Sequence, residues 1–437
     1  MPASIQSLPP LAATCSDGFL LGLDSLMRRT RQGHHLAATV IECEGTPDLA
    51  ALRNAAEVLG HRYPVLHARL ARGGDFIARW RIDEVTPAAI PLEVHEVTVS
   101  GLQGFIEPRL NARDPDTHAA GANLRFHVVI TSQSTWALVL IWSHSLHDAV
   151  GIDKLLLEIA SPGEDRTPRS GGNDSPALVE SMSALYQKAL PMIQEMRTFP
   201  QWRIRSLHRK GVRPGESRVN VINFDREATT TIRAKMAATA GELLLLPYFA
   251  SIVARAVQSV IAARHPDEQV PVLLSLPVQR QGARPLFQNH MGVYTLLLTA
   301  EELAELKPAT RALYRKSADF MRRKLLTSMD AVMRMMERCP SRFYNLPVFL
   351  YLKGEVCTMF HSHTGSFAPG LVEMHGCRVT NGYHVPSVCS PPGIGIFFSE
   401  FAGQLSMTLS WKEGCLSPLE LELLKQKLAE DLGAPVP

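Results

Sequence analysis

The stretch Trp136–Gly151, WALVLIWSHSLHDAVG, constrains the fold more than any other part of the chain. Its apolar run ends abruptly at His144, Asp148 follows four residues later, and Gly151 three residues after that. A short continuous apolar run bounded by polar residues is typical of a strand that is covered on both faces. A histidine at the point where such a strand gives way to a loop can be held rigidly and still reach a cleft. We therefore expect a buried strand with the candidate chemistry at its end.

The length and composition indicate a globular protein of two domains. A chain of 437 residues is longer than the chains that usually fold around a single hydrophobic core. Its 46% hydrophobic and 20% charged residues are ordinary for a globular fold. The 45 basic and 42 acidic residues nearly balance, and no long Lys/Arg run occurs, which argues against a nucleic-acid-binding protein.

The cysteines and the apolar segments indicate a cytoplasmic location. The seven cysteines are odd in number, widely spaced and free of any Cys-x-x-Cys motif, so we expect reduced thiols. The first residues show no basic region followed by an apolar one, and we expect no signal peptide. The most apolar window, Leu243–Val257, contains Pro247 and Arg255, which predicts a buried core helix rather than a membrane span.

The pattern along the chain predicts a mixed α/β fold with two sheet-and-helix halves. Ser161–Pro176 is rich in Pro, Gly, Ser and charge and has no apolar periodicity, as linkers do. We therefore predict an N-terminal subdomain over residues 1–165, a linker over 166–176 and a C-terminal subdomain over 177–437.

Several helices have recognisable ends or long periodic patterns. Thr46–Leu59 is predicted to be a helix capped by Thr46, with Pro47 in its first turn. Ala309–Glu337 is predicted to be strongly helical. Ser417–Asp431 is predicted to close the chain as a helix that opens with a capping box.

The motif segment, IWSHSLHDAVGIDKLLLEI, resembles the active-site segment of the chloramphenicol-acetyltransferase-like acyltransferases, whose pattern is His-x-x-x-Asp-Gly. Other segments resemble family segments and occur in the expected order: His61–Leu66 (HRYPVL), Leu124–Ile130, Ser275–Arg280 (SLPVQR), Asn289–Gly292 (NHMG), Ser362–Gly365 (SHTG) and Gln404–Asp431. The resemblance covers the chain from about residue 30 to its end. It implies two subdomains of this superfamily's fold with an active-site tunnel between them.

Two departures from the family pattern bear on its branches. Ala149 stands where the glycine usually follows the aspartate, and Ser143 stands in place of the first histidine of the double-His condensation signature. The second departure disfavours a peptide-synthetase condensation domain. The resemblance is nearer to the stand-alone alcohol and polyketide-associated acyltransferases.

The resemblance assigns His144 as the general base of an acyl transfer. The acceptor must lose a proton as it attacks the thioester, and a histidine pKa lies near working pH. Asp148 has two interpretations. It could orient His144 as a triad aspartate does, or, as the superfamily implies, point away and pair with an arginine that fixes the loop. We favour the second, with Arg280 as the partner and Arg284 as the runner-up.

Further tunnel residues follow from the same resemblance. Ser362 and Thr364 are candidates for stabilising the oxyanion, with a turn-forming cluster as the alternative. His147 is expected to line or flank the tunnel, and Asn289 to hold a turn near it.

The implied reaction moves an acyl group from coenzyme A, or from the phosphopantetheine arm of an acyl-carrier protein, to a small-molecule acceptor. A hydroxyl acceptor is favoured over an amine. We expect no permanently bound cofactor, no metal and no membrane span. We also expect the protein to be a monomer.

Two other functions stay open at this point. The fold could serve as a non-catalytic binding or carrier-docking module, for which Ala149 is the motivation if its position needs a positive φ. A metal-dependent hydrolase could use His144, His147 and Asp148 as ligands, with His361 and His363 as further donors.

Overall fold

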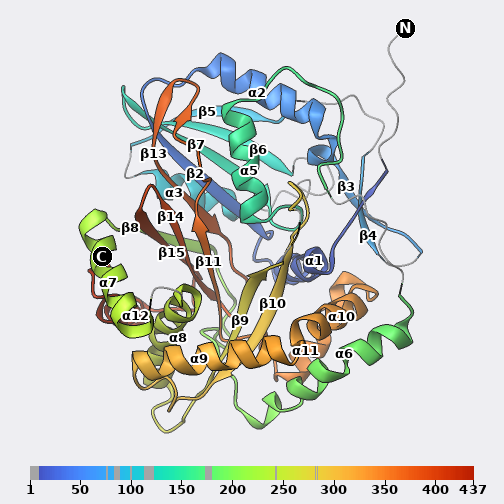
Figure 1. Cartoon of the computed structure of the whole chain (residues 1–437), viewed down its shortest axis with the longest axis vertical. Coiled ribbons are helices and arrows are strands. Elements are labelled where there is room, and N and C mark those ends of the chain that lie inside the picture. The colour runs from blue at the N-terminus through green and yellow to red at the C-terminus, as the bar shows by residue number, and fades with distance from the viewer. Residues whose placement is uncertain are drawn as a thin grey trace.

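The computed structural model describes most of the chain (Figure 1). The described residues are 9–74, 77–82, 89–98, 101–112, 123–172, 180–241, 244–280, 282 and 284–437. Two six-stranded sheets and a small three-stranded sheet are packed with helices. The predicted mixed α/β class with two sheet-and-helix halves is confirmed.

The motif lies in the sheet whose strand order is β12-β13-β2-β7-β6-β5. The strands are β2 (Leu36–Glu44), β5 (Leu92–Glu96), β6 (Leu124–Ile130), β7 (Thr135–Ser143), β12 (Glu373–Met374) and β13 (Cys377–Pro386). Strand β7 lies between β2 and β6 and is antiparallel to both.

Helices cover both faces of this sheet (Figure 1). They are α2 (Leu49–Arg62) and α5 (Ala149–Ala160) on one face and α3 (Leu102–Leu110) on the other. Alternate residues of β7 face opposite ways, so Leu138 and Leu140 pack with α2 and α5, whereas Val139 packs with α3. The apolar run before His144 is therefore a strand buried on both faces, as its composition predicts.

The second large sheet has the order β10-β9-β11-β14-β15-β8. Its strands are β8 (Ser217–Asn223), β9 (Val272–Gln279), β10 (Met291–Leu298), β11 (Met359–Ser366), β14 (Ile394–Phe401) and β15 (Gln404–Lys412). Strand β11 runs parallel to β9 and β14, and the other pairs are antiparallel.

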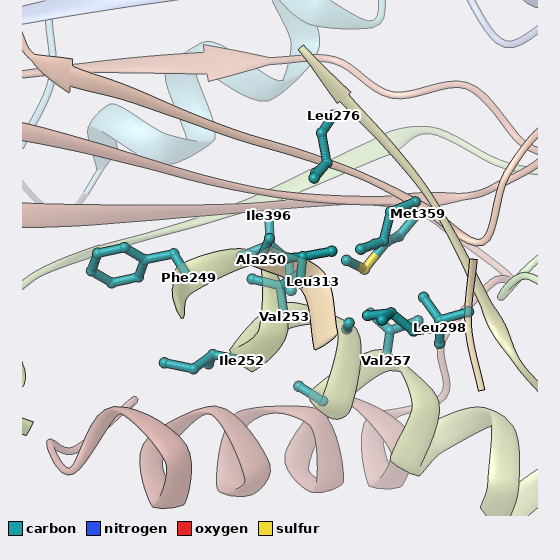
Figure 2. Packing of buried hydrophobic residues seen from close by; sticks show 14 of the residues in the cluster. Phe249, Ala250, Ile252, Val253, Val257, Leu276, Leu298, Leu313, Met359 and Ile396 are labelled. Carbon is teal, nitrogen blue, oxygen red and sulfur yellow. The ribbon is translucent and has the colours of Figure 1, made fainter. Parts of the chain in front are cut away.

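The largest core lies beneath this second sheet. Its helices are α7 (Arg226–Ala240), α8 (Leu245–Arg264), α9 (Leu306–Arg322) and α12 (Pro418–Leu432). Figure 2 shows side chains of α8, such as Val253 and Val257, packed among Leu276 of β9, Met359 of β11 and Ile396 of β14. Helix α8 is buried because it lies between the sheet and the helices α9 and α12.

Helix α8 is long and apolar enough to cross a membrane by length and composition, but most of it is buried within the fold. It carries one buried cation, Arg255, whose guanidinium pairs with Asp431 of α12 at 2.7 Å and donates to the carbonyl of Leu303. The pair shows why an apolar helix contains an arginine: the charge joins two helices inside the core. The window predicted as a core helix is confirmed as one over its described residues.

A third group of elements completes the fold. It comprises β1 (Leu11–Ala12), α1 (Cys15–Arg29), η1 (Pro64–His67), β3 (Arg69–Arg72), β4 (Ala78–Arg81), α6 (Met182–Met196), η3 (Phe199–Gln201), α10 (Leu325–Glu337), η4 (Ser341–Phe343) and α11 (Leu346–Tyr351). Helix α1 begins with a capping box of Thr14 and Asp17 and packs on α10. Although it comes first in the sequence, α1 therefore lies against an element of the C-terminal half.

The chain also crosses between the halves near its C-terminal end. Strands β12 and β13 come from the segment predicted as the C-terminal subdomain, yet they extend the sheet that carries the motif. Their nearest strand neighbour, β2, is more than three hundred residues away in the sequence, so local patterns do not show this pairing. Residues 173–176 of the predicted linker lie outside the described residues, and the boundary at 166–176 stays a prediction.

The helix ends show where local patterns succeed and where they fail. The capping box of Ser417 and Glu420 is confirmed. Helix α2 begins later than predicted, because Asp48 rather than Thr46 caps it by accepting from the backbone N–H of Ala51. The predicted helix over 309–337 is two helices, α9 and α10, which are separated at Lys324 by a left-handed backbone conformation.

All seven cysteines are unpaired in the structure, and Cys339 is the exposed one. This agrees with the prediction of reduced thiols.

The buried pair of Arg255 and Asp431 provides a test of the core. Replacing Asp431 with Ala leaves the guanidinium of Arg255 buried without its carboxylate, so we expect a loss of about 3–5 kcal/mol in the free energy of unfolding. The measurement is urea denaturation followed by circular dichroism. Glu430→Ala, next to it on the exposed side of α12, is the control and should have a much smaller effect. Equal effects of the two substitutions would contradict the assignment.

Candidate active site

The motif loop connects β7 to α5. Strand β7 ends at Ser143, a turn follows, and α5 begins at Ala149. Asp148 caps the helix, because its Oδ1 accepts from the backbone N–H of Gly151 at 2.7 Å. A carboxylate in this position is also favoured by the helix dipole. The spacing of histidine and aspartate thus places a strand-end histidine directly before a capped helix.

The ring of His144 is held in one tautomer. Its Nδ1 lies 3.1 Å from the backbone carbonyl of His147. A carbonyl only accepts hydrogen bonds, so Nδ1 carries the proton and donates. In the neutral ring, Nε2 is then left with its lone pair free to accept a proton. His144 lines the central cavity and is partly exposed to it.

Aromatic neighbours surround this imidazole and fix its plane. The ring of His35 stacks on it with centroids 5.1 Å apart and an angle of 2° between planes, and Trp142 meets it edge-on at 5.2 Å. The backbone N–H of His144 also donates to the carbonyl of His35. Burial lowers the pKa of His144 from its ordinary value of 6.5, because a charged imidazole is poorly solvated there. The neutral, basic form therefore predominates at pH 7.

A segment of the other half holds the motif loop from behind. Residues 286–290, between β9 and β10, make three hydrogen bonds to it. The N–H of Gln288 donates to the carbonyl of Leu146, Nδ2 of Asn289 to the carbonyl of His144, and the N–H of His290 to Oδ2 of Asp148, at 2.7, 2.9 and 3.1 Å. We call residues 286–290 the clasp segment.

The clasp segment is in turn fixed by α1. The carboxylate of Asp17 accepts from both the backbone N–H and the side-chain amide of Asn289, at 2.7 and 2.8 Å. Asp17 is fully buried, and burial raises its pKa to about 7, against the lowering effect of the hydrogen bonds from Thr14 and Asn289. Asn289 thus links α1 to the carbonyl of His144.

The predicted pair of Asp148 and Arg280 is not formed in the structure. The Arg280 guanidinium instead pairs with Asp330 of α10 at 2.5 Å and donates to the carbonyl of Met291. Asp148 is satisfied by the backbone N–H groups of Gly151 and His290, so it needs no cation. Arg284, the runner-up, donates from its side chain to Gln279. The interpretation of Asp148 as a residue that fixes the loop, rather than one that orients the imidazole, agrees with these contacts.

The residues around Asp148 explain the departure from the family pattern. Ala149 is the first residue of α5 and does not have a positive φ, so alanine fits there without strain. Gly151 is needed for a close approach, since a Cβ at this position would lie 2.4 Å from the carbonyl oxygen of Leu286 in the clasp segment. The motivation for a non-catalytic module, a strained Ala149, is removed.

The central cavity lies where the two large sheets meet. Its lining comes from α1, from β2, β7 and β13 of the first sheet, and from β9, β10, β11 and β14 of the second. Its volume is about 190 Å³, against roughly 10–15 Å³ for one water on the same measure. Apolar side chains such as Leu20, Leu23 and Phe398 alternate with histidines and hydroxyls on its walls. An organic substrate therefore fits beside His144.

Two of the remaining candidate residues lie on the cavity wall, and the other two are buried behind it. Ser362 and Thr364 of β11 line the cavity, and the hydroxyl of Thr364 is 3.4 Å from the carbonyl of Phe398. His147 does not line it: the side chain is fully buried against Trp142 and Phe287, behind His144. Asn289 is also buried behind the loop. Of the two positions expected for His147, the wall is therefore not the one it takes, because it packs under the loop that carries His144. Asn289 holds this loop through the carbonyl of His144, which agrees with the turn-holding role expected of it.

The proposed metal ligands of the motif do not converge. Among the described residues, one group of three His, Cys, Asp or Glu side chains has its ligand atoms all within 4.8 Å of one another, and it lies on β5 and β6. In the motif, the Nδ1 of His144 is occupied by the carbonyl of His147, and both oxygens of Asp148 accept backbone N–H groups. His361 uses its Nδ1 on the carbonyl of Ile396.

Three cavity histidines, His35, His290 and His384, were not predicted as site residues from the sequence. His35 stacks on His144, and His384 of β13 shares the cavity with it. The Nε2 of His384 lies 3.1 Å from Oδ1 of Asp153 on α5, and its Nδ1 lies 2.9 Å from the hydroxyl of Thr39. These residues are dispersed over the sequence, and no spacing signal links them to the motif.

Comparison with known proteins supports the fold. No protein-family model matches the chain, and no curated protein matches it. Among solved structures, the trichothecene 15-O-acetyltransferase of Fusarium sporotrichioides is similar over 99% of both chains, with a TM-score of 0.71 and 10% identity.

Two further structures widen the comparison. The wax ester synthase/diacylglycerol acyltransferase of Marinobacter aquaeolei matches over 97% of this chain and 98% of its own, with a TM-score of 0.59 and 15% identity. A starter condensation domain of the rhizomide synthetase, solved with C8-CoA, matches over 98% and 96%, with a TM-score of 0.60 and 13% identity. The chain thus has the fold of this acyltransferase and condensation-domain group, and the resemblance drawn from the motifs is confirmed for the fold.

The close contact at Gly151 provides a test of the site. In Gly151→Ala the new Cβ must push α5 away from the clasp segment, and overpacking of this kind costs about 1–3 kcal/mol. We therefore expect the free energy of unfolding of Gly151→Ala to be lower than that of the wild type by this amount.

Gly104→Ala is the matched control. Gly104 lies within α3, where a Cβ would meet nothing within 4 Å, so this substitution should leave stability equal or slightly higher. The measurement is thermal unfolding. Wild-type behaviour of Gly151→Ala would refute the steric role of Gly151.

Proposed function

We propose that this protein is an acyltransferase that moves an acyl group from a thioester to a hydroxyl of a small molecule. The observation that supports this most is the state of His144. Its Nδ1–H is tied to the carbonyl of His147, its pKa is lowered, and the ring borders a cavity between the two halves. A neutral imidazole with a free Nε2 at a substrate-sized cavity is what a general base requires.

The reaction proceeds through direct attack. The acceptor hydroxyl gives its proton to Nε2 of His144 while its oxygen forms a bond to the thioester carbonyl carbon. The tetrahedral intermediate then collapses, the carbon–sulfur bond breaks, and the leaving sulfur takes the proton back from Nε2. The products are an ester and a free thiol, and His144 returns to its neutral state. Such proton transfer contributes roughly 10²–10⁴-fold to the rate.

The other site residues position His144 or stabilise the oxyanion. Asp148, which caps α5 and accepts from His290, and Asn289, which holds the carbonyl of His144, fix the loop that carries the base. Both are positioning residues rather than catalytic ones. The hydroxyls of Ser362 and Thr364 on the facing wall are the proposed donors to the oxyanion; loss of one such donor costs about 2.7–4 kcal/mol.

The donor is an acyl group on coenzyme A or on the phosphopantetheine arm of a carrier protein, and it enters as a co-substrate rather than as a bound cofactor. Support comes from the fold shared with a condensation domain that was solved with C8-CoA and with acetyl- and acyl-transferring enzymes. The mainly apolar wall of the cavity suits an acyl chain. We further propose that the protein acts as a cytoplasmic monomer.

An amide-forming condensation is the second candidate, because condensation domains share the fold. Ser143 in place of the first signature histidine favours the ester-forming enzyme. A condensation enzyme would transfer the acyl group to an amine and not to an alcohol.

Thiol release tests the proposed reaction. Acyl-CoAs of rising chain length are offered with simple alcohols and amines, and the free thiol is followed by a colorimetric reagent. We expect acceptor-dependent release by the wild type and a loss of roughly 10²–10⁴-fold in His144→Ala, because the acceptor keeps its proton. His265→Ala, at the end of α8 and away from the cavity, should retain activity.

The outcomes separate the alternatives. Release that persists in His144→Ala rules out this residue as the base. Release with amines alone supports condensation. Where no acyl-CoA reacts, acyl-carrier proteins are supplied as donors, and inactivity with these as well supports a non-catalytic module.

The pH dependence tests the environment of His144. Activity requires the neutral ring, so it falls as the pH drops through the pKa of His144. Because burial lowers this pKa, we expect the acid limb of kcat/KM to lie below pH 6.5. The charge of Asp148 raises the pKa of His144, so Asp148→Asn should shift the limb further toward acid. An acid limb at or above pH 6.5 in the wild type would contradict the proposed environment.

A further inference from the structure

Three side chains that the acyl-transfer site does not use converge on the sheet face covered by α3. They are Glu93 and His95 of β5 and His127 of β6, and their ligand atoms all lie within 4.8 Å of one another. This group lies on other strands than those that form the cavity. A role of these three side chains therefore does not depend on the proposed acyl transfer.

The backbone brings the three residues together. Glu93 and His95 are alternate residues of one strand, so their side chains leave the same face of the sheet. Strand β5 pairs in parallel with β6, and in this register Glu93 lies opposite His127. The group is therefore built by an ordinary cross-strand arrangement, with ligands from two adjacent strands.

The distances within the group match those between the ligands of a tetrahedral metal ion. The Nε2 of His95 lies 3.2 Å from Oε2 of Glu93 and 3.3 Å from Nδ1 of His127, and this Nδ1 lies 3.5 Å from the same Oε2. Zinc binds imidazole nitrogen and carboxylate oxygen at about 2.0–2.2 Å, which places tetrahedral ligands about 3.3–3.5 Å apart. Two edges of the triangle, at 3.3 and 3.5 Å, fall within this separation, and the third, at 3.2 Å, is 0.1 Å shorter.

Hydrogen bonds can account for at most two of the three edges of the triangle at once. A charge-assisted bond between a histidine and a carboxylate is about 2.7–2.9 Å long, which is shorter than either imidazole–carboxylate distance here. The two ring nitrogens offer at most one proton each, and one N–H cannot point at two acceptors in line. Three nearly equal distances are what a metal ion bound at the centre of the three side chains would produce.

The surroundings fix the two imidazoles and leave one side open. The ring of Phe105 on α3 meets His95 and His127 edge-on, with centroids 4.8 and 5.7 Å away. His127 is buried, whereas the Glu93 side chain is about half exposed at 54%. An ion therefore has a route of entry beside Glu93, and a water can complete its coordination.

Two nearby charges, on Arg109 and Arg125, oppose a cation, because both interact with His127, and the effect of Arg109 is the larger. The guanidinium of Arg109 lies over the ring of Phe105 at 3.4 Å from its centroid and interacts with the charge of Glu93. It repels a bound dication, so its removal should tighten binding.

We propose that Glu93, His95 and His127 form a binding site for a divalent transition-metal ion, with zinc as the best-fitting one. Two imidazoles and one carboxylate are ligands that zinc accepts, with a fourth position left for water. The ion would tie β5, the edge strand of its sheet, to β6. Its role is to secure an edge that backbone hydrogen bonds hold from one side only.

The experiment uses the full-length protein after removal of metals with EDTA and dialysis. Zinc is titrated by calorimetry, Co²⁺ is added separately to record the visible bands of four-coordinate cobalt, and thermal unfolding is followed with and without zinc. We expect one zinc equivalent, four-coordinate cobalt bands and a higher Tm with zinc, since a ligand of the folded state stabilises it.

Variants identify the ligands. Glu93→Gln and His95→Ala alter partly exposed side chains and should each abolish the cobalt bands and the zinc-dependent rise in Tm. Arg109→Gln should tighten binding. His265→Ala and His144→Ala are controls for other histidines of the chain and should bind zinc as the wild type does. The proposal is overturned if the wild type binds no equivalent, or if the bands persist in Glu93→Gln and His95→Ala.

Discussion

The structure of the site depends on the contact between the clasp segment and the motif loop. Residues 286–290 connect β9 to β10 of the second sheet, and the loop that carries His144 follows β7 of the first. Three hydrogen bonds of 2.7–3.1 Å join them, and Gly151 lets the two backbones approach closely. The cavity exists because this contact, together with the crossing of β13, holds the two sheets in a fixed relation.

The contacts of the motif loop also determine the state of His144. With its carbonyl held by Asn289 and its Nδ1 directed at the carbonyl of His147, the imidazole has one orientation and one tautomer. Burial then keeps it neutral. Asp148 contributes through the backbone, because its carboxylate caps a helix and accepts from the clasp segment. A carboxylate that binds backbone N–H groups needs no arginine. Arg280 instead pairs with Asp330, and this ion pair links α10 to the end of β9.

Sequence reasoning succeeded where the signal was local. The continuous apolar run predicted a doubly covered strand that ends at His144, and the start of the segment Ser417–Asp431 predicted a capping box. It failed where the partner came from a distant segment. The distant partner of Asp148 is the backbone N–H of residue 290. The amino-acid type at that position does not indicate that its backbone will be the donor. His147 and Asn289 could be placed near the motif, but not behind it, because burial depends on what packs over the loop.

The sequence by itself determined the fold class, the two halves and the position of the candidate base, because hydrophobic periodicity and helix capping act over a few residues. Only the tertiary structure decided the pairing of β13 with β2, the tautomer and pKa shift of His144, the presence of His35 and His384 in the cavity, and the convergence of Glu93, His95 and His127. Each of these depends on distances between segments that are far apart in the chain. Such distances are set by how the sheets and helices pack together, and no local pattern contains them.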